Sequence, residues 1–300
     1  MRVIVTGGAG FIGSHLVDAL IERGDEVLVI DNLSTGKREN INPRARFFKR
    51  DICRFWSMRS LFESVDYVFH LAALARVLIS RENPYETHKV NVDGTVNVLW
   101  ASVCAEVKKV IYSSSSSVYG PQATLPLKEE MIPAPISPYG DQKLYDERCC
   151  RAFTEAYGLR VTCLRYFNVY GRRQSDDSQY SSVIGKFLKN NQGRKLSVIY
   201  DGNQSRDFTH VSDVVIANIL AMESPRTGLG EAINIGAGNG VSINQLAQMI
   251  GGLYTHEGPR PGDIKHSLAD ISKAKELLDW KPRISLNEGI TQLKKLYGIV

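Results

Sequence analysis

A tyrosine and a lysine stand four residues apart in ISPYGDQK, residues 136–143. Ser137 suits the N-cap of a helix and the proline after it suits the first helical position, so the sequence predicts a helix that runs to Tyr157 and stops at Gly158. In such a helix the tyrosine and the lysine lie one turn apart on the same face. The spacing alone also fits an ordinary surface pair, so the rest of the chain must decide.

The pair has a chemical use if it lies in a site. A free tyrosine has a pKa of about 10 and is a poor base at neutral pH. A lysine cation one turn away favours the phenolate, because it stabilises the negative charge. Tyr139 would then act as a general base toward a hydroxyl group, with Lys143 lowering its pKa.

The elements that would position this helix follow from the first half of the chain. Short apolar runs, rich in β-branched residues, alternate there with helix-like segments. Such runs are typical of strands covered on both faces, and the alternation indicates a parallel sheet with right-handed crossovers. The expected strands are 2–7, 26–31, 66–73, 108–115 and 160–166.

Two further helices are expected between these strands. One runs from about Ser14 to Arg23 and is closed by Gly24. Residues 90–99 alternate apolar and polar positions, which favours a strand. Their place between two parallel strands requires a crossover, so we predict a helix there.

A glycine motif separates the first strand from the first helix. Gly7, Gly10 and Gly13 have the spacing G-x-x-G-x-x-G, and glycines there let the backbone approach a pyrophosphate at a helix N-terminus. Asp31 ends the second strand, where a carboxylate binds ribose hydroxyls and repels a 2′-phosphate. The motif predicts a dinucleotide site that prefers NAD to NADP.

These features predict an α/β fold, a Rossmann-like doubly wound parallel sheet with a smaller α/β C-terminal substrate lobe. Residues 1–167 would form the NAD-binding domain and 168–300 the lobe. A strand near 231–236 would return to the main sheet. Ser242 and Gln245 form a capping box that predicts another helix.

Composition bounds the function. The 43% hydrophobic and 23% charged residues are those of a soluble globular protein, and the net charge of +5 is too mild to indicate nucleic-acid binding. With no apolar run that spans a bilayer and no signal peptide, we expect a cytoplasmic protein without a membrane partner. The five cysteines show no C-x-x-C and no metal-ligand spacing, so no metal is expected.

Five motifs occur in order: the glycine motif, HLAA at 70–73, a serine run before VYG at 118–120, Tyr139-x-x-x-Lys143, and RYFN at 165–168. Together they resemble the extended short-chain dehydrogenases/reductases that act on nucleotide sugars, which include NAD-dependent epimerases and dehydratases. The resemblance is strongest to UDP-hexose 4-epimerases, including the branch that uses N-acetylated sugars, and it spans nearly the whole chain.

The resemblance implies three catalytic residues, Ser115, Tyr139 and Lys143. Ser115 would hydrogen-bond the sugar oxygen and shuttle its proton, and Lys143 would also hold the nicotinamide ribose. The implied reaction oxidises C4 of the sugar with NAD, turns the 4-keto sugar over, and returns the hydride to its other face. The expected substrates are UDP-Glc and UDP-Gal, and also UDP-GlcNAc and UDP-GalNAc.

The resemblance also implies binding residues. The expected cofactor contacts are Gly7, Gly10, Phe11, Ile12, Gly13, Asp31, Asn32, Leu33, Ser34, Thr35, Gly36, Asp51, Ile52, Leu71, Ala72, Ala73, Asn91, Ser113, Tyr139, Lys143, Tyr166 and Phe167. The expected substrate contacts are Ser115, Tyr139, Asn168, Tyr200, Arg206, Arg260, Asp263 and Ser267. The two arginines would hold the diphosphate, and the small Ser267 would leave room for an N-acetyl group.

Alternatives remain open. VIYDGNQSR lacks one glycine of the family pattern, so either Ile199 or Tyr200 would face the uracil, and the segment before Arg260 is short. Family dehydratases carry acids where this chain has Ser116 and Ser117, which makes a 4,6-dehydratase less consistent, while a reductase stays open. A non-catalytic NAD-binding sensor is the alternative of another class.

Family members often dimerise through the Tyr139 helix and the helix around residues 90–104. Both segments carry more apolar side chains than one core face needs, so we expect a homodimer. These side chains are Val96, Leu99, Trp100, Val103, Leu144 and Phe153.

Overall fold

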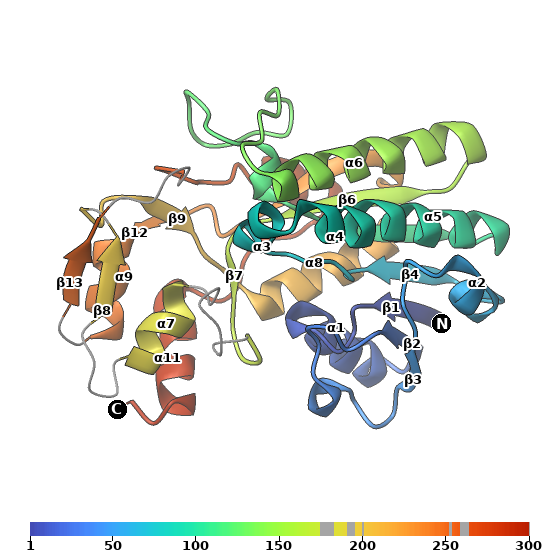
Figure 1. The fold of residues 1–300 in the computed structure, drawn as a ribbon, viewed down its shortest axis with the longest axis horizontal. Helices are drawn as coiled ribbons and strands as arrows, with labels where there is room; N and C mark the ends of the chain where they lie inside the picture. The colour runs from blue at the N-terminus through green and yellow to red at the C-terminus, as the bar shows by residue number, and fades with distance from the viewer. Residues whose placement is uncertain (175–182, 191–195, 200, 252–253, 259–263, 300) are drawn as a thin grey trace.

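The computed structural model describes the chain except residues 175–182, 191–195, 200, 252–253, 259–263 and 300 (Figure 1). A seven-stranded parallel sheet with the order β11-β6-β5-β4-β1-β2-β3 forms its centre. The strands are β1 (Arg2–Thr6), β2 (Glu26–Asp31), β3 (Arg46–Lys49), β4 (Tyr67–His70), β5 (Lys109–Ser115), β6 (Val161–Tyr166) and β11 (Leu229–Ile235).

Helices cover both faces of this sheet. Figure 1 shows α5 (Gly94–Cys104) and α6 (Pro138–Tyr157) on one face and α1 (Phe11–Glu22) and α8 (Val211–Glu223) on the other. A further helix, α10 (Ser272–Leu278), contacts α8. Strand β2 is buried on both faces: Val27 and Val29 pack in the core under α1, and Leu28 and Ile30 pack in the core under α5. The predicted α/β doubly wound fold is confirmed.

Short helical segments complete this part of the chain. They are α2 (Phe55–Met58), α3 (Val77–Glu82), α4 (Pro84–His88), a π-helix (Lys89–Asp93), and 3₁₀-helices at Arg38–Asn40, Arg59–Phe62 and Ser116–Val118. None of the helices within the described ranges is long and apolar enough to cross a membrane.

Local signals placed α6 correctly. The Ser137 side chain accepts the Gly140 N–H at 3.1 Å as N-cap, and Gly158 closes the helix with φ +70°. Residues 90–99 are helical, as the crossover argument predicted. The start predicted for the first helix, Ser14, is wrong: α1 begins at Phe11, because Gly10 is an N-cap without a side-chain signal.

The strand expected near 231–236 is β11, which pairs with β6 at the edge of the sheet. The elements after β6 other than α8, β11 and α10 form a smaller unit around a third apolar core. They are β7 (Val169–Tyr170), α7 (Val183–Asn190), β8 (Leu196–Ile199), β9 (Ser205–Asp207), β10 (Thr209–His210), β12 (Gly240–Ser242), α9 (Ile243–Ile250), β13 (Tyr254–Glu257) and α11 (Leu286–Leu296). Ser242 and Gln245 form the predicted capping box of α9.

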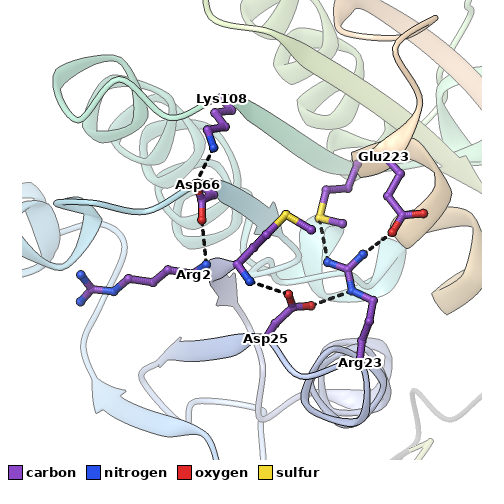
Figure 2. A network of polar contacts seen from close by, with 8 residues as sticks. Arg2, Arg23, Asp25, Asp66, Lys108 and Glu223 are labelled. Atoms are coloured by element: carbon purple, nitrogen blue, oxygen red, sulfur yellow. Dashed lines mark hydrogen bonds and ion pairs between the residues drawn. The ribbon is translucent and has the colours of Figure 1, made fainter.

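Ion pairs fasten the amino-terminal edge of the sheet, where β1, β4 and β5 begin (Figure 2). Asp25 accepts hydrogen bonds from the chain's amino group at 3.0 Å and from Arg23 Nε at 2.7 Å, and Arg23 also pairs with Glu223 of α8. On the other side of β1, Asp66 accepts the backbone N–H of Arg2 at 2.8 Å. This edge lies opposite the carboxyl ends of the strands.

Candidate active site

A cavity of about 780 Å³ opens at the carboxyl ends of the strands. Its walls come from the β1–α1 turn, the ends of β2 and β5, the first turns of α6 and, from the smaller unit, β9 and α7. In a parallel α/β sheet this edge is where ligands bind. The cavity is therefore the candidate active site.

The turn between β1 and α1 is shaped for a close backbone approach. Gly7 has φ +71°, and a Cβ there would lie 2.7 Å from the backbone nitrogen of Ala72. A Cβ on Gly13 would collide with the carbonyl oxygen of Gly7. Gly10 supplies no side-chain cap to α1, so among the described residues the first N–H groups of this helix, at the cavity wall, have no capping side chain. A phosphate fits such a helix start.

Asp31 ends β2 at the cavity wall. Its Oδ2 accepts the Ala9 N–H at 3.0 Å and its Oδ1 accepts the Leu33 N–H at 2.7 Å. Burial raises the pKa of Asp31, and these two hydrogen bonds oppose that rise. A carboxylate offers about four lone-pair positions, so positions remain for ribose hydroxyls. Asp31 thus holds the glycine turn and still presents an acceptor to a ligand.

Most other expected cofactor contacts line the cavity as well. They are Phe11, Ile12, Asn32, Ser34, Thr35, Ile52, Leu71, Ala72, Ala73, Ser113 and Tyr166. The expected contacts that do not line it are Leu33, Gly36, Asp51, Asn91 and Phe167. Gly36 packs against Asp31, and Phe167 lies in a core. Asn91 is buried, and its Oδ1 accepts the Leu74 N–H at 2.8 Å, so it supports the loop that lines the cavity.

Ser115, Tyr139 and Lys143 all line this cavity. Ser115 is the last residue of β5, and its Oγ accepts the Ser117 N–H at 3.1 Å. Tyr139 is held at the start of α6 by its backbone N–H, which donates to Ser80 Oγ at 3.1 Å. The Lys143 Nζ lies 6.0 Å from the centre of the Tyr139 ring. The structure thus brings the three expected catalytic residues to one place.

Charges around Tyr139 differ from the sequence-based picture. Burial raises the pKa of Tyr139 to about 12, while hydrogen bonding with Ser115 and the Arg76 cation oppose the rise. Lys143 Nζ is directed elsewhere, since it donates to Tyr112 Oη at 2.9 Å and to the Ser113 carbonyl at 2.8 Å. Sequence reasoning assigned the charge effect to Lys143 and missed Arg76.

Arg76 reaches the cavity from the N-terminus of α3. Its carbonyl accepts the Ser80 N–H at 3.1 Å, and Ser80 in turn accepts the Tyr139 N–H, so the three residues are joined. Burial lowers the pKa of Arg76, and Tyr139 opposes this. A signal was available: Arg76 follows HLAA closely, and residues just after a strand in a parallel sheet reach the ligand edge.

Two residues expected to bind the substrate reach the cavity from beyond the Rossmann-like strands. Arg206 lies on β9, and its Nη1 donates to the Ser205 carbonyl at 2.9 Å. Asn168 follows β6, and its Nδ2 donates to the Asp207 carbonyl at 3.0 Å. The buried Asp207 carboxylate accepts the N–H groups of the 237–238 loop at 2.6 and 3.0 Å. These hydrogen bonds hold β9, and with it Arg206, against that loop.

The remaining expected substrate contacts are not placed in the cavity. Ser267 is 6% exposed and does not line it, and its N–H donates to the carbonyl of Ser205 on β9 at 3.1 Å. Tyr200, Arg260 and Asp263 lie outside the described residues. Their roles, and that of Ser267 beside an N-acetyl group, stay predictions.

The charge of the cavity wall favours anions. The basic side chains among its described lining are Lys37, Arg50, Arg76, Lys143, Arg173, Lys186 and Arg206, and the acidic one is Asp31. A positive cleft attracts phosphorylated ligands and raises their local concentration. Within the described ranges, no cluster of three or more His, Cys, Asp or Glu side chains is arranged to hold a metal ion.

Comparisons with known proteins agree with this geometry. The sequence profile of the NAD dependent epimerase/dehydratase family matches residues 3–236. A UDP-glucose 4-epimerase from Lactobacillus helveticus is 35% identical over 94% of this chain and 92% of its own.

Two solved structures share the whole fold. The UDP-glucose 4-epimerase of Thermotoga maritima, solved with UDP-glucose, is 42% identical, with a TM-score of 0.94 over 99% of each chain. The UDP-N-acetylglucosamine 4-epimerase of Methanobrevibacter ruminantium, solved with UDP-N-acetylmuramic acid, is 41% identical, with a TM-score of 0.92 over 98% of each chain. With its profile match, its full-length relatives and a cavity that carries the motifs, the chain belongs to the NAD-dependent epimerase/dehydratase family.

Proposed function

We propose that this protein is a UDP-sugar 4-epimerase that interconverts UDP-Glc and UDP-Gal, and also UDP-GlcNAc and UDP-GalNAc. The observation that carries the proposal is that Ser115, Tyr139 and Lys143 line the same cavity as the glycine turn. The Thermotoga and Methanobrevibacter proteins support the substrate class, because they are a UDP-glucose and a UDP-N-acetylglucosamine 4-epimerase.

The cavity fits NAD at the β1–α1 turn. Gly7 and Gly13 leave no room for a Cβ, and the uncapped start of α1 suits a pyrophosphate. Asp31 would bind the adenosine ribose, and Lys143 the nicotinamide ribose. When bound, NAD supplies the acceptor and donor of a hydride at C4 of the sugar.

Tyr139 performs the proton transfer at the 4-hydroxyl. It removes the proton as the sugar is oxidised and returns one as the epimer forms, and Ser115 hydrogen-bonds the same sugar oxygen. Since burial raises the pKa of Tyr139 to about 12, the phenolate depends on the positive charges around it. Arg76 at the cavity wall supplies such charge, while Lys143, whose Nζ lies 6.0 Å from the centre of the Tyr139 ring, donates to Tyr112.

The sugar must turn over between the two half-reactions, so the fixed contacts belong on the nucleotide diphosphate. Arg206 and Asn168 both line the cavity and suit this role. An arginine fork binds phosphate oxygens with charge-assisted hydrogen bonds that do not involve the sugar ring. The site would hold UDP firmly and leave the hexose free to rotate.

A 4,6-dehydratase fits less well. Eliminating water requires an acid and a base beside the sugar, and the positions after Ser115 are Ser116 and Ser117. Serine hydroxyls do not titrate near neutral pH. The same set of Ser115, Tyr139 and Lys143 argues against a non-catalytic NAD sensor, since binding alone requires no buried tyrosine–serine pair.

We also propose a homodimer formed through α5 and α6. Trp100 on α5 is 40% exposed and Tyr157 on α6 is 55% exposed, and their ring centres lie 5.5 Å apart. Phe153 adds a further ring 5.2 Å from Tyr157. Such an exposed aromatic cluster on two adjacent helices suits a symmetric interface.

A cytoplasmic location and the lack of a nucleic-acid or membrane partner stay predictions.

The proposal is tested by incubating the purified protein, without added cofactor, with the four UDP-sugars deuterated at C4 and following the products by NMR. We expect each sugar to reach equilibrium with its C4 epimer. The deuterium should remain at C4, because the hydride never leaves the site. The Tyr139→Phe protein serves as the control that folds and binds but does not turn over.

Other outcomes would contradict the proposal. A 4-keto-6-deoxy product would indicate a dehydratase, and turnover only after NADH is added would indicate a reductase. Bound NAD with no conversion of any sugar would favour the sensor. Conversion of UDP-Glc and UDP-Gal alone would contradict activity on the N-acetylated sugars but would still support a UDP-sugar 4-epimerase.

A further inference from the structure

A buried polar cluster lies behind Lys143, away from the cavity. Lys143 Nζ donates to Tyr112 Oη at 2.9 Å, and Tyr112 Oη donates to Asp146 Oδ2 at 2.5 Å. Asp146 is 0% exposed and Tyr112 is 1% exposed, and neither lines the cavity. A carboxylate is thus connected to the expected catalytic lysine through one hydroxyl group.

Helix geometry places these groups in line. Asp146 follows Lys143 by three residues and Tyr139 by seven, so all three lie on the same face of α6. Tyr112 stands opposite them on β5, and its ring centre is 4.7 Å from Lys143 Nζ. The tyrosine therefore fills the space between the lysine and the carboxylate.

Asp146 is costly as a structural residue. Its Oδ1 is buried and has no hydrogen-bond partner of normal geometry among the described residues, although, against the effect of burial, the Thr95 hydroxyl acts to lower the pKa of Asp146. Burying an ionised carboxylate with an unsatisfied oxygen destabilises a fold, and an apolar side chain of similar size would pack there without this cost. The position is better explained by an effect on its neighbours than by a contribution to stability.

The neighbour most affected is Lys143. Burial lowers the pKa of Lys143, and Asp146 is the largest of the charges that raise it again. In return, burial raises the pKa of Asp146 to about 7 against the opposing effects of Lys143 and of the Tyr112 hydrogen bond. Asp146 also raises the pKa of Tyr139.

The other titratable groups that face the cluster do not take over this role. They are Tyr139, Glu147 and Cys150 on α6, Tyr112 on β5, His70 on β4 and Cys163 on β6. Glu147 forms an ion pair with Arg165 at 2.7 Å. Burial lowers the pKa of His70 to about 3. The hydrogen bond with Cys150, together with burial, raises the pKa of Cys163, and burial raises the pKa of Cys150, so both thiols stay protonated. Burial likewise keeps Tyr112 a hydrogen-bond donor by raising its pKa.

We propose that Asp146, acting through Tyr112, is a positioning residue that keeps Lys143 charged and fixed beside Tyr139. This rests on the proposed function, in which Lys143 and Tyr139 form the reacting end of the site. The carboxylate compensates the lysine charge in a place that water does not reach, and the Tyr112 hydroxyl fixes the direction of Nζ.

The test is the pH profile of kcat for Asp146→Asn, measured on the enzyme with its bound NAD. Without the buried negative charge the pKa values of both Lys143 and Tyr139 fall. We therefore expect the acidic limb, set by Tyr139, and the alkaline limb, set by Lys143, both to move to lower pH by about half a unit or more. Such a shift changes kcat about threefold at a given pH on each limb. KM for the UDP-sugar should stay unchanged, because Asp146 lies outside the cavity lining.

Two further variants keep the test sharp. Asp141→Asn removes an exposed carboxylate from the same helix and should leave the profile in place. Tyr112→Phe removes the hydroxyl that joins Lys143 to Asp146 but keeps the Asp146 charge. It should therefore lower kcat with a smaller shift of the pH profile, and it replaces Asp146→Asn as the test if that variant does not fold. A uniform loss of kcat in Asp146→Asn with the profile in place would overturn the proposal.

A readout without substrate separates this proposal from the proposed function. The ultraviolet titration of Tyr139 in the NAD-bound protein, taken as the difference from the Tyr139→Phe background, reports the same charge. Its pKa should fall in Asp146→Asn and stay unchanged in Asp141→Asn. An unchanged pKa in Asp146→Asn would overturn the positioning role, whatever the sugar panel shows.

Discussion

The two edges of the seven-stranded sheet are fastened in different ways. At the amino-terminal edge, Arg23 and Asp25 join with Glu223 and the chain's amino group, and most of these groups are in contact with solvent (Figure 2). At the carboxyl edge, Tyr139 and Lys143 are 8% and 3% exposed and bond to groups buried beneath the cavity.

The groups at the amino-terminal edge contribute to stability, whereas the groups at the carboxyl edge are suited to the reaction. Ion pairs near the surface contribute about 0–1 kcal/mol each, and a neutral pair could replace them. Buried charges and hydroxyls cost free energy when they are incompletely paired, and they are where perturbed pKa values serve a reaction. Substitutions at the carboxyl edge should therefore reduce turnover more than stability, and those at the amino edge the reverse.

Tyr139→Phe should have the largest effect. The variant keeps the ring that packs in the site and removes the group that accepts the sugar proton, so kcat should fall by about 10² to 10⁴. The free energy of unfolding and the bound NAD should change little. Turnover is measured by NMR on UDP-Glc and stability by urea unfolding.

Tyr145→Phe is the matched control for Tyr139→Phe, since Tyr145 lies on the same helix and is 50% exposed. It should match the wild type in both measurements. A Tyr139→Phe protein within threefold of the wild-type kcat would remove Tyr139 from the reaction and with it the contrast between the two edges.

Asp31→Asn should weaken the retention of NAD. The amide keeps one acceptor for the Ala9 or Leu33 N–H and removes the charge that binds ribose hydroxyls. Hydrogen bonds to a charged group contribute about 1.5–3 kcal/mol, so NAD should dissociate about ten- to a hundredfold more readily. The preference of the site for NAD over NADP should become smaller, because the neutral amide no longer repels the 2′-phosphate of NADP. Equal binding of both cofactors by the wild type would show that Asp31 does not select.

Arg76→Gln should move the acidic limb of the kcat profile to higher pH, because the Arg76 cation lowers the pKa of Tyr139. The sign is opposite to that expected for Asp146→Asn. A shift of about half a unit corresponds to roughly threefold at a given pH on that limb. Arg76→Lys keeps the charge and should restore the profile. A rise in KM alone, with the limb in place, would make Arg76 a ligand contact instead.

Local signals explain what the sequence could predict. The ends of α6 are set by Ser137, Pro138 and Gly158, which act on their own backbone, so they can be read without tertiary contacts. The helix at 90–99 required an argument from topology, because its pattern favoured a strand. The start of α1 was missed, since a glycine N-cap leaves no side-chain trace.

Long-range packing explains the rest. Arg76 reaches Tyr139 only because α3 packs against α6, and Tyr112 reaches Lys143 and Asp146 only because β5 packs against α6. No spacing in the sequence predicts these contacts between elements. Ser267 was expected at the sugar from its place after a motif; it is buried and does not line the cavity, and its role beside an N-acetyl group stays a prediction. Motifs identified the residues at the strand ends, whereas charge partners depended on which elements lie side by side.

Asp25→Asn at the amino edge should have the smallest effect. Burial acts to raise the pKa of Asp25, but Arg23 and the chain's amino group outweigh it and hold that pKa below its usual value. The variant should lose roughly 0.5–1 kcal/mol in the free energy of unfolding and keep kcat. Because the folded-state pKa is lowered, this contribution is fully present above the unfolded pKa of about 4 and is lost as the pH falls through the folded value. Urea unfolding at neutral and acid pH measures it, with Glu22→Gln at the exposed end of α1 as the control. A loss of turnover in Asp25→Asn without a change in stability would show that the two edges are not independent.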